Sequence, residues 1–251
     1  MRLRYAISLW NYTHYSQAPS LEEICQSLRQ EGYGIELWGS WRDEPDLYGQ
    51  AARHRLQQAL AGMAVSLHTA GAPTWALHRK QIDAAAALGA GVVVLHPRDL
   101  VASQPGGLDA ALARRAVAYA AERGVRLALE NGPLPFLAQA AEQVPGLGIC
   151  LDVGHVYATP DPMAAFLAAL GERIIHLHIQ DVVAPPEAGL AGAAKDHYVP
   201  GTGGIPRADW ELLVRTLRQV DYQGLAVFEI QPRRPLQTAF LARGFLAGLL
   251  D

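Results

Sequence analysis

The stretch GVVVLH at residues 91–96 is an unbroken apolar run that ends on a histidine. A strand with one face in water alternates polar and apolar residues, whereas a strand buried on both faces reads as a continuous apolar run. Such strands are typical of parallel sheets whose two faces are covered by helices. The stretch therefore predicts an α/β fold.

Seven other runs of the same kind recur along the chain. They are LRYAISL (3–9), YGIELW (33–38), AVSLH (64–68), GVRLALE (124–130), LGICLD (147–152), RIIHLHI (173–179) and GLAVFEI (224–230). Segments with the apolar spacing of helices lie between them, for example at 20–32, 73–90 and 106–124. Ser20 is placed to cap the first of these helices, and Gly32 is placed to end it.

The eight strands alternate with helical segments, and no linker or break in composition separates them. This pattern predicts a single-domain (β/α)₈ TIM barrel over residues 1–251. The alternative is an open doubly wound sheet, which normally carries a glycine-rich phosphate turn after its first strand. Here that turn reads WNYTHYSQ at 10–17 and contains no glycine. We therefore expect the closed barrel.

The composition is that of a globular protein, because 50% of the 251 residues are hydrophobic and 18% are charged. No stretch approaches the roughly 18 uninterrupted apolar residues that span a bilayer, and the first run suits a strand better than a signal peptide. Cys25 and Cys150 are the only cysteines, which favours a reducing cytoplasm over a disulfide framework. The net charge of -3 argues weakly against a nucleic-acid partner without excluding one.

Potential metal ligands stand at six successive strand ends. In a barrel of this kind the functional groups project from the C-terminal ends of the strands. These positions hold His68, His96, Glu130, Asp152 with His155 just beyond it, His178 and Glu229. One such residue alone is more often a hydrogen-bonded rim residue than a ligand. Six together would repel one another and lose solvation, so we predict that a divalent cation lies among them.

The predicted first metal site consists of three carboxylates and one imidazole: Glu130, Asp152, His178 and Glu229. This donor set suits Mn²⁺, Mg²⁺ or Zn²⁺. His68 and His96 could hold a second ion that shares Glu130, and their imidazoles favour Zn²⁺ or Mn²⁺ there. We expect one bound divalent ion, with donors available for two or more.

The other histidines are expected to lie outside these sites. His176 points to the same side of its strand as His178 but lies deeper, so we expect it in the barrel interior, behind the ligands. Three more fall in loop or helix segments and are expected on the solvated surface: His14, His54 and His78.

The segments beyond the strands offer groups that could contact a substrate. Residues 180–205 form the longest irregular stretch, which we expect to act as a lid or substrate wall, with His197 turned back over the mouth. Trp10 and Trp38 follow the first two strands and could form an apolar wall for a sugar or for a partner subunit of a homo-oligomer. Arg233 lies past the last strand and could bind a sugar phosphate or only lie at the rim of the barrel.

Seven short motifs carry a family resemblance. They are GIELW (34–38), LHP (95–97), LEN (129–131), DVGH (152–155), HLHIQD (176–181), HYVPGTG (197–203) and FEI (228–230). With these motifs the chain resembles the xylose isomerase-like TIM barrels. That superfamily contains sugar and sugar-phosphate isomerases and epimerases, together with abasic-site nucleases of the endonuclease IV type.

For the epimerase branch the resemblance implies one ion held by four residues: Glu130, Asp152, His178 and Glu229. It also implies that the two glutamates move the proton and that His155 contacts the substrate. Some ketose epimerases carry a further glutamate where this chain has Phe136, so the chain departs from the pattern for free ketohexoses. We therefore expect a metal-dependent isomerase or epimerase of a small carbohydrate, free or phosphorylated. It would act through a metal-stabilised enediolate, with the two glutamates as acid and base.

The nuclease branch gives the alternative, a zinc-dependent AP endonuclease that hydrolyses a phosphodiester. The resemblance then implies three zinc ions, held by the strand-end residues together with His155 and His197 and by an aspartate two residues before the latter. That position is Lys195 here, and a protonated amine has no lone pair for zinc. We therefore expect the third site, which would rest on His155 and His197, to be impaired. Asp196 is adjacent, but we expect its side chain to point differently. Retro-aldol, dehydratase and non-catalytic binding roles are further alternatives.

Overall fold

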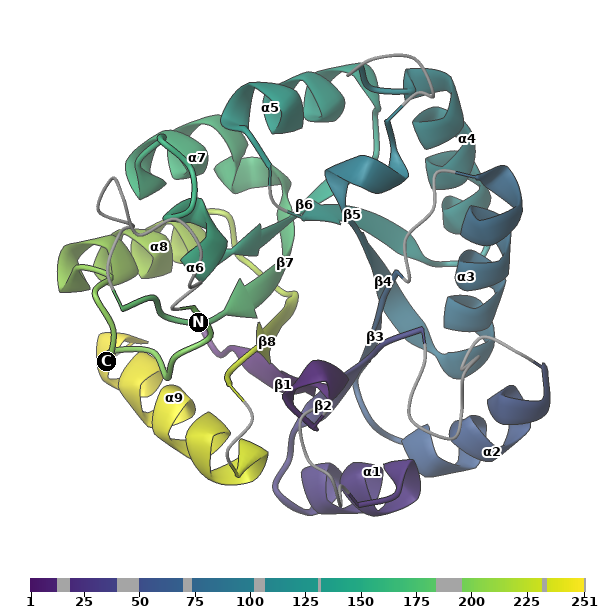
Figure 1. Cartoon of the computed structure of the whole chain (residues 1–251), viewed down its shortest axis with the longest axis horizontal. Helices are drawn as coiled ribbons and strands as arrows, with labels where there is room; N and C mark the ends of the chain where they lie inside the picture. Colours follow the sequence, from purple (N-terminus) through teal and green to yellow (C-terminus); the bar gives the residue numbers. More distant parts are fainter. Residues whose placement is uncertain are drawn as a thin grey trace.

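Eight strands form a closed ring with helices around the outside, as Figure 1 shows. This computed structural model describes residues 1–12, 19–39, 50–69, 74–101, 107–130, 132–183, 196–231 and 234–250. The strands are β1 (Arg4–Ser8), β2 (Gly34–Leu37), β3 (Val65–His68), β4 (Ala90–Leu95), β5 (Arg126–Glu130), β6 (Gly148–Asp152), β7 (Ile174–Ile179) and β8 (Leu225–Phe228). Each pairs in parallel with its neighbours, and β1 also pairs with β8. The predicted barrel is therefore confirmed, and the open sheet is excluded.

The helices alternate with the strands and cover the outer face of the ring (Figure 1). They are α1 (Leu21–Gln30), α2 (Gln50–Leu60), α3 (Trp75–Leu88), α4 (Ala110–Ala121), α5 (Leu134–Gln143), α6 (Val153–Val156), α7 (Met163–Leu170), α8 (Arg207–Gln219) and α9 (Pro235–Leu250). Short 3₁₀ helices are η1 (Leu9–Tyr12), η2 (Pro97–Asp99) and η3 (Gly171–Arg173). In the part of the chain that the structure describes, no helix combines the length and the apolar character needed to cross a bilayer.

The first helix begins and ends where its sequence predicts. The Glu23 backbone N–H donates to Ser20 Oγ over 3.3 Å, and the Ser20 backbone N–H donates to Glu23 Oε2 over 2.8 Å. This reciprocal pair is a capping box, which satisfies two backbone donors at the helix start. Past the other end, Gly32 has a φ of 74°, a left-handed conformation that glycine adopts without strain.

Beneath the strand ends, apolar side chains fill part of the barrel interior. Two buried clusters occupy this region: Ala6, Leu225 and Val227, and Val92, Val94, Ala128 and Cys150. Because alternate residues of a strand face the same side, Ala128 lies one step below Glu130, and Cys150 one step below Asp152. These apolar side chains therefore form part of the floor beneath the polar groups at the strand ends.

Candidate metal centre

Four buried side chains meet at the C-terminal mouth of the barrel. Their positions are the end of β5 for Glu130, the end of β6 for Asp152, β7 for His178, and the residue after β8 for Glu229. One potential ligand atom from each lies within 4.8 Å of the others. Asp152 and His178 are also register partners on adjacent strands. The structure thus brings together the four residues that the sequence predicts as the first metal site.

His178 lies among the carboxylates of this group. Its Nδ1 atom is 2.9 Å from Glu130 Oε1 and 3.6 Å from Glu229 Oε2. Burial would raise the pKa of Glu130, but the imidazoles of His178 and His68 outweigh it and hold that pKa well below its usual range. At Glu229 burial dominates and raises the pKa. The two glutamates therefore differ in proton affinity, although both are buried at the same mouth.

A second group shares Glu130 with the first. His68 Nε2 lies 3.1 Å from Glu130 Oε2, and His96 Nε2 lies 3.2 Å from the same oxygen. The ligand atoms of these three residues lie within 4.8 Å of one another. Two imidazoles around one carboxylate oxygen form the arrangement that the sequence predicts for a second ion.

Past the strand ends, His155 and His197 lie beside Asp196. His155 Nδ1 is 2.8 Å from Asp152 Oδ2, and the Asp152 carboxylate raises the pKa of His155 to about 10. Asp196 Oδ1 is 3.0 Å from His197 Nδ1, and its Oδ2 is 3.6 Å from His155 Nε2.

The expectation that Asp196 points away is therefore wrong. Side chains alternate only along an extended strand, and His197 has a φ of 62°, which turns the chain at this point. Lys195, the position that the resemblance assigns to a third-site ligand, lies outside the described residues.

Glu36 on β2 is a buried charged residue that sequence reasoning missed. Its Oε2 accepts a hydrogen bond from Ser66 Oγ over 2.9 Å and lies 2.8 Å from His176 Nε2. Its Oε1 lies 2.9 Å from His178 Nε2, although the two are not aligned as a hydrogen bond. A carboxylate in the middle of a buried strand is rare unless it is paired. A glutamate inside an otherwise apolar run is therefore the feature of the sequence that indicates a partner for Glu36.

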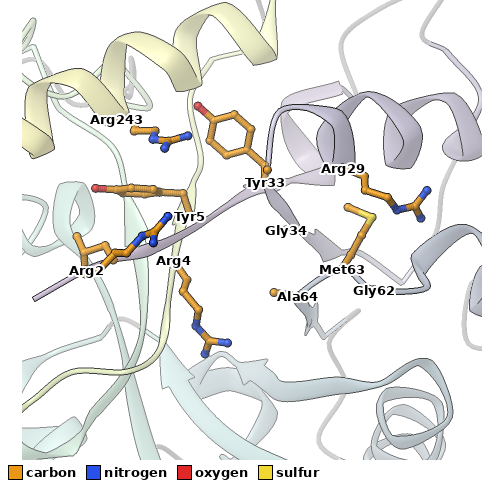
Figure 2. Close-up of a pocket in the computed structure, with 12 residues that line it drawn as sticks. Arg2, Arg4, Tyr5, Arg29, Tyr33, Gly34, Gly62, Met63, Ala64 and Arg243 are labelled. Atoms are coloured by element: carbon orange, nitrogen blue, oxygen red, sulfur yellow. The ribbon is translucent and has the colours of Figure 1, made fainter.

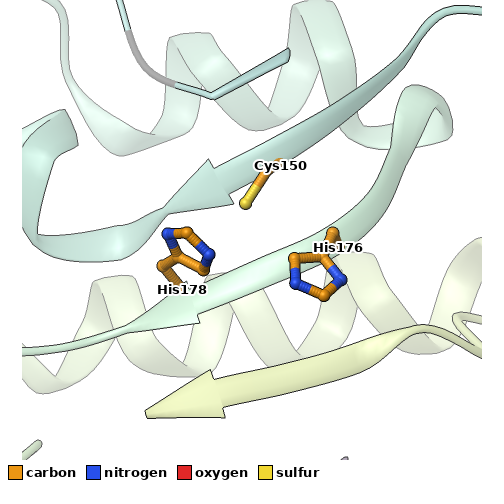
Figure 3. A group of neighbouring side chains, drawn as sticks. All are labelled: Cys150, His176 and His178. Carbon is orange, nitrogen blue, oxygen red and sulfur yellow. The ribbon is translucent and has the colours of Figure 1, made fainter. Parts of the chain in front are cut away.

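Behind the mouth, Cys150 on β6 faces His176 and His178 on β7, as Figure 3 shows. One ligand atom of each lies within 4.8 Å of the others. Burial raises the pKa of the Cys150 thiol, so it stays protonated and is a poor metal ligand. The interior position expected for His176 is found, and its contact with Glu36 links it to the back of His178.

Gln180 is a second residue that sequence reasoning missed. Its side-chain amide donates to Asp152 Oδ1 over 3.0 Å and to Asp152 Oδ2 over 2.8 Å. Its oxygen accepts from the backbone N–H of His197 over 2.7 Å. Gln180 therefore fixes a predicted ligand and the position of His197. It packs so closely on Gly154 that a Cβ there would lie 2.7 Å from Gln180 Cδ.

Asp181 holds the two described ends of the segment after β7 together. Its carboxylate accepts backbone N–H groups from Val182, Gly201, Gly203 and Ile205. The backbones of Asp181 and Tyr198 also exchange hydrogen bonds. The expected lid over residues 180–205 is only partly described, since 184–195 lie outside the described residues.

Two tryptophan rings pack against histidines of the candidate site. The Trp38 ring is stacked on His68 with 4.2 Å between ring centroids, and the Trp10 ring lies 4.3 Å from that of His197. Both donate to the Ser8 hydroxyl, Trp38 through its indole N–H over 2.9 Å and Trp10 through its backbone N–H over 3.3 Å. Both rings therefore border the candidate site. Arg233 lies outside the described residues.

One surface histidine was predicted wrongly. His78 is 2% exposed, and its Nε2 lies 3.0 Å from the carbonyl oxygen of Asp99. It shares the buried face of α3 with Gln81 and Ile82, and the carbonyl beyond β4 satisfies its ring nitrogen. His54 is exposed as predicted, and His14 lies outside the described residues.

The four-residue group fits a divalent cation by its chemistry. Three carboxylates supply the oxygen ligands that Mg²⁺ and Mn²⁺ prefer, and one imidazole extends the fit to Zn²⁺. Glu229 Oε1 is buried and has no hydrogen-bond partner among the described residues. A buried carboxylate oxygen without a partner carries a desolvation penalty, which a bound cation would offset.

The chain resembles known proteins both in its family and in its fold. The family model described as xylose isomerase-like TIM barrel matches residues 29–245. Fructoselysine 3-epimerase of Shigella flexneri is 29% identical over 86 residues, which are 34% of this chain and 27% of that protein. The aligned part thus spans about a quarter of that curated relative.

Solved structures share the fold along nearly the whole chain. D-allulose 3-epimerase from Methylomonas sp. in complex with D-allulose has a TM-score of 0.67 at 20% identity, covering 98% of this chain and 97% of that one. The IolI protein with a bound zinc atom has a TM-score of 0.75 at 15% identity, covering 99% of this chain and 98% of that one. At these identities the likeness is one of fold.

Proposed function

This chain belongs to the xylose isomerase-like TIM barrel family, and we propose that it is a divalent-metal-dependent isomerase or epimerase of a sugar or sugar phosphate. The observation that carries the proposal is the convergence of Glu130, Asp152, His178 and Glu229 within 4.8 Å at the barrel mouth. The epimerase names of the relatives support the reaction class. The free buried thiols of Cys25 and Cys150 support a reducing compartment such as the cytoplasm.

Glu130, Asp152, His178 and Glu229 would hold the ion. When bound, a divalent cation polarises a substrate carbonyl and stabilises the negative charge that develops as the α-proton leaves. The zinc named in the IolI structure is consistent with such a site, and Mn²⁺ or Mg²⁺ suits the same donors.

Glu130 and Glu229 are the groups we assign to proton transfer. They come from β5 and β8, which are well separated around the ring, so they can flank a substrate at the mouth. One takes the α-proton as a carboxylate, and the other returns a proton as the acid. His155 lies at the rim and would contact a substrate hydroxyl, while Trp10 and Trp38, which pack on His197 and His68, would give the substrate an apolar wall.

The test is exchange of the substrate α-hydrogen with solvent deuterium, followed by NMR across a panel of ketoses and ketose phosphates. We expect metal-dependent exchange with at least one sugar, lost by about 10²-fold or more in Glu130→Gln and in Glu229→Gln. Glu142→Gln on the exposed face of α5 is the matched control and should retain full exchange. Absence of exchange with every sugar and sugar phosphate would overturn the proposal.

A zinc-dependent AP endonuclease is the second candidate, because Asp196 lies between His155 and His197. Its carboxylate is placed to complete a third set of donors at the position that Lys195 does not fill. Such an enzyme would cleave an oligonucleotide that carries an abasic site. Cleavage that requires metal and disappears in both Glu130→Gln and Asp196→Asn would favour the nuclease. An intact oligonucleotide together with sugar exchange would favour the isomerase.

A further inference from the structure

At the opposite end of the barrel from the metal centre lies a cavity of about 470 Å³. It is bordered by the start of β1, the start of β2 at Gly34, and Ala64 just before β3, with Arg243 of α9 on one side (Figure 2). The volume is within the range of about 300 to 1,000 Å³ that small-molecule sites occupy. The catalytic groups lie at the other ends of these strands, so the cavity is separate from the metal centre.

The lining of the cavity is strongly basic. It contains four arginines from three segments of the chain: Arg2 and Arg4 at the start of β1, Arg29 in α1 and Arg243 in α9. It contains no lysine and no acidic residue. Among the described residues, no carboxylate oxygen lies within 4.0 Å of a nitrogen of these four guanidinium groups. Arginine stays charged at every physiological pH, so four positive charges share this end of the barrel without a neutralising ion pair.

Two of the arginines are held in place by the backbone. Arg4 donates to the carbonyl of Gln223 over 2.7 Å, and Arg29 donates to the carbonyl of Ala59. Neutral carbonyls orient these guanidinium groups without cancelling their charge. Each guanidinium has five N–H donors, so donors remain for a ligand.

Tyrosines form the remaining polar part of the wall. The Arg243 guanidinium lies 5.7 Å from the ring centre of Tyr5 and 5.9 Å from that of Tyr33. Tyr33 is 5% exposed, and its hydroxyl is buried without a hydrogen-bond partner among the described residues. Figure 2 shows this hydroxyl on the side of the ring that faces Arg243. The Tyr33 hydroxyl and the Arg243 guanidinium therefore offer hydrogen-bond donors on the same side of the cavity.

We propose that this cavity binds a small organic anion that carries two phosphate groups. Planar guanidinium groups match phosphate oxygens in pairs, which makes arginine the preferred residue for such ligands. More than one phosphate is expected because Arg29 lies apart from the other three arginines, beyond Tyr33 and Gly34 (Figure 2). The tyrosine rings give the organic part of the ligand an apolar surface. The site does not depend on the function proposed for the metal centre.

The test is isothermal titration calorimetry of the metal-loaded protein with pyrophosphate at low ionic strength. We expect saturable binding, weakened about tenfold or more in Arg2→Gln/Arg243→Gln because charge-assisted hydrogen bonds are lost. Arg215→Gln on the exposed face of α8 removes the same charge elsewhere and should leave the affinity within twofold of the parent. Inorganic phosphate should bind at least tenfold more weakly than pyrophosphate.

Three results would overturn the proposal. They are no saturable binding at millimolar pyrophosphate, an equal loss of affinity in Arg215→Gln, and phosphate binding as tight as pyrophosphate binding. The variant Asp152→Asn, which changes a predicted metal ligand, tests whether pyrophosphate binds at the metal centre or in the cavity. Unchanged pyrophosphate affinity supports the cavity, whereas lost affinity places the anion at the metal centre and contradicts it. Sugar exchange should persist in the double arginine variant, so failure of this proposal and failure of the proposed function are distinguishable.

Discussion

At the scale of single residues, Glu36 lies directly behind the predicted ligand His178 and interacts with its ring. Its two carboxylate oxygens contact the neighbouring imidazoles of β7, at 2.8 Å from His176 and 2.9 Å from His178. A carboxylate close behind a metal-binding imidazole raises the basicity of the ring through its charge, so that the opposite nitrogen binds the ion better. Here the opposite nitrogen, Nδ1, faces Glu130. Glu36 is therefore a positioning residue of the candidate centre.

We predict that Glu36→Gln weakens binding of Zn²⁺ or Mn²⁺ about 10- to 100-fold, the range found when such a supporting group is changed. The amide keeps the size of the side chain but removes its charge. Competitive titration against a fluorescent chelator measures the affinity directly and does not require a known substrate. Glu142→Gln, on the exposed face of α5, should bind the ion as the parent does. Equal affinity in Glu36→Gln would show that the residue only fills space.

At the scale of elements, the contact between α6 and β7 sets the position of Asp152. Gly154 in α6 lets Gln180 approach closely, and Gln180 then donates to both oxygens of Asp152. A Cβ at Gly154 would meet Gln180 Cγ and Cδ at 2.7 Å. Gln180 is fully buried and tied by its hydrogen bonds, so it cannot move aside freely.

Gly154→Ala is expected to lower the free energy of unfolding by about 1 to 3 kcal/mol, as overpacking of a filled interior does. Urea denaturation followed by circular dichroism measures the change. Gly244→Ala in α9 is a matched control, because a Cβ there meets nothing within 4 Å. That control should gain about 0.5 to 1 kcal/mol from the better helix propensity of alanine. An unchanged or raised stability in Gly154→Ala would contradict the close packing described for α6 and β7.

At the scale of the whole molecule, a cation held by four elements should stabilise the barrel. Glu130, Asp152, His178 and Glu229 come from β5, β6, β7 and the end of β8, so an ion that binds only the folded protein ties half of the ring together. At an ion concentration about 100-fold above its Kd, the stabilisation is about 2.7 kcal/mol.

Chelation by EDTA is therefore expected to lower Tm by about 5 to 10 °C for a chain of this length. Differential scanning calorimetry with and without added Mn²⁺ or Zn²⁺ measures the shift. In Asp152→Asn the shift should be largely lost, because one ligand is gone and the ion binds weakly. The same Tm for the parent protein in chelator and in excess metal would contradict a structural contribution of the ion.

The sequence predicts the features that depend on neighbouring residues and misses those that depend on contacts between distant parts of the chain. Each strand is buried on two faces, so its apolar run is continuous and readable, and the strand ends then give the candidate ligands by position. Glu36 was missed because its contacts join β2 to β7, residues that are 140 positions apart and meet only once the ring closes. The direction of Asp196 was wrong because the left-handed backbone at His197 breaks the alternation of an extended strand.

The central claim is a divalent cation among Glu130, Asp152, His178 and Glu229, and anomalous X-ray scattering tests it most directly. Crystals grown with Mn²⁺ or Zn²⁺ should give an anomalous peak at the absorption edge of the added metal, within coordination distance of these four side chains. Crystals of Asp152→Asn grown in the same way should lose most of that peak. No anomalous density between the four side chains of the parent protein, at saturating metal, would contradict the account.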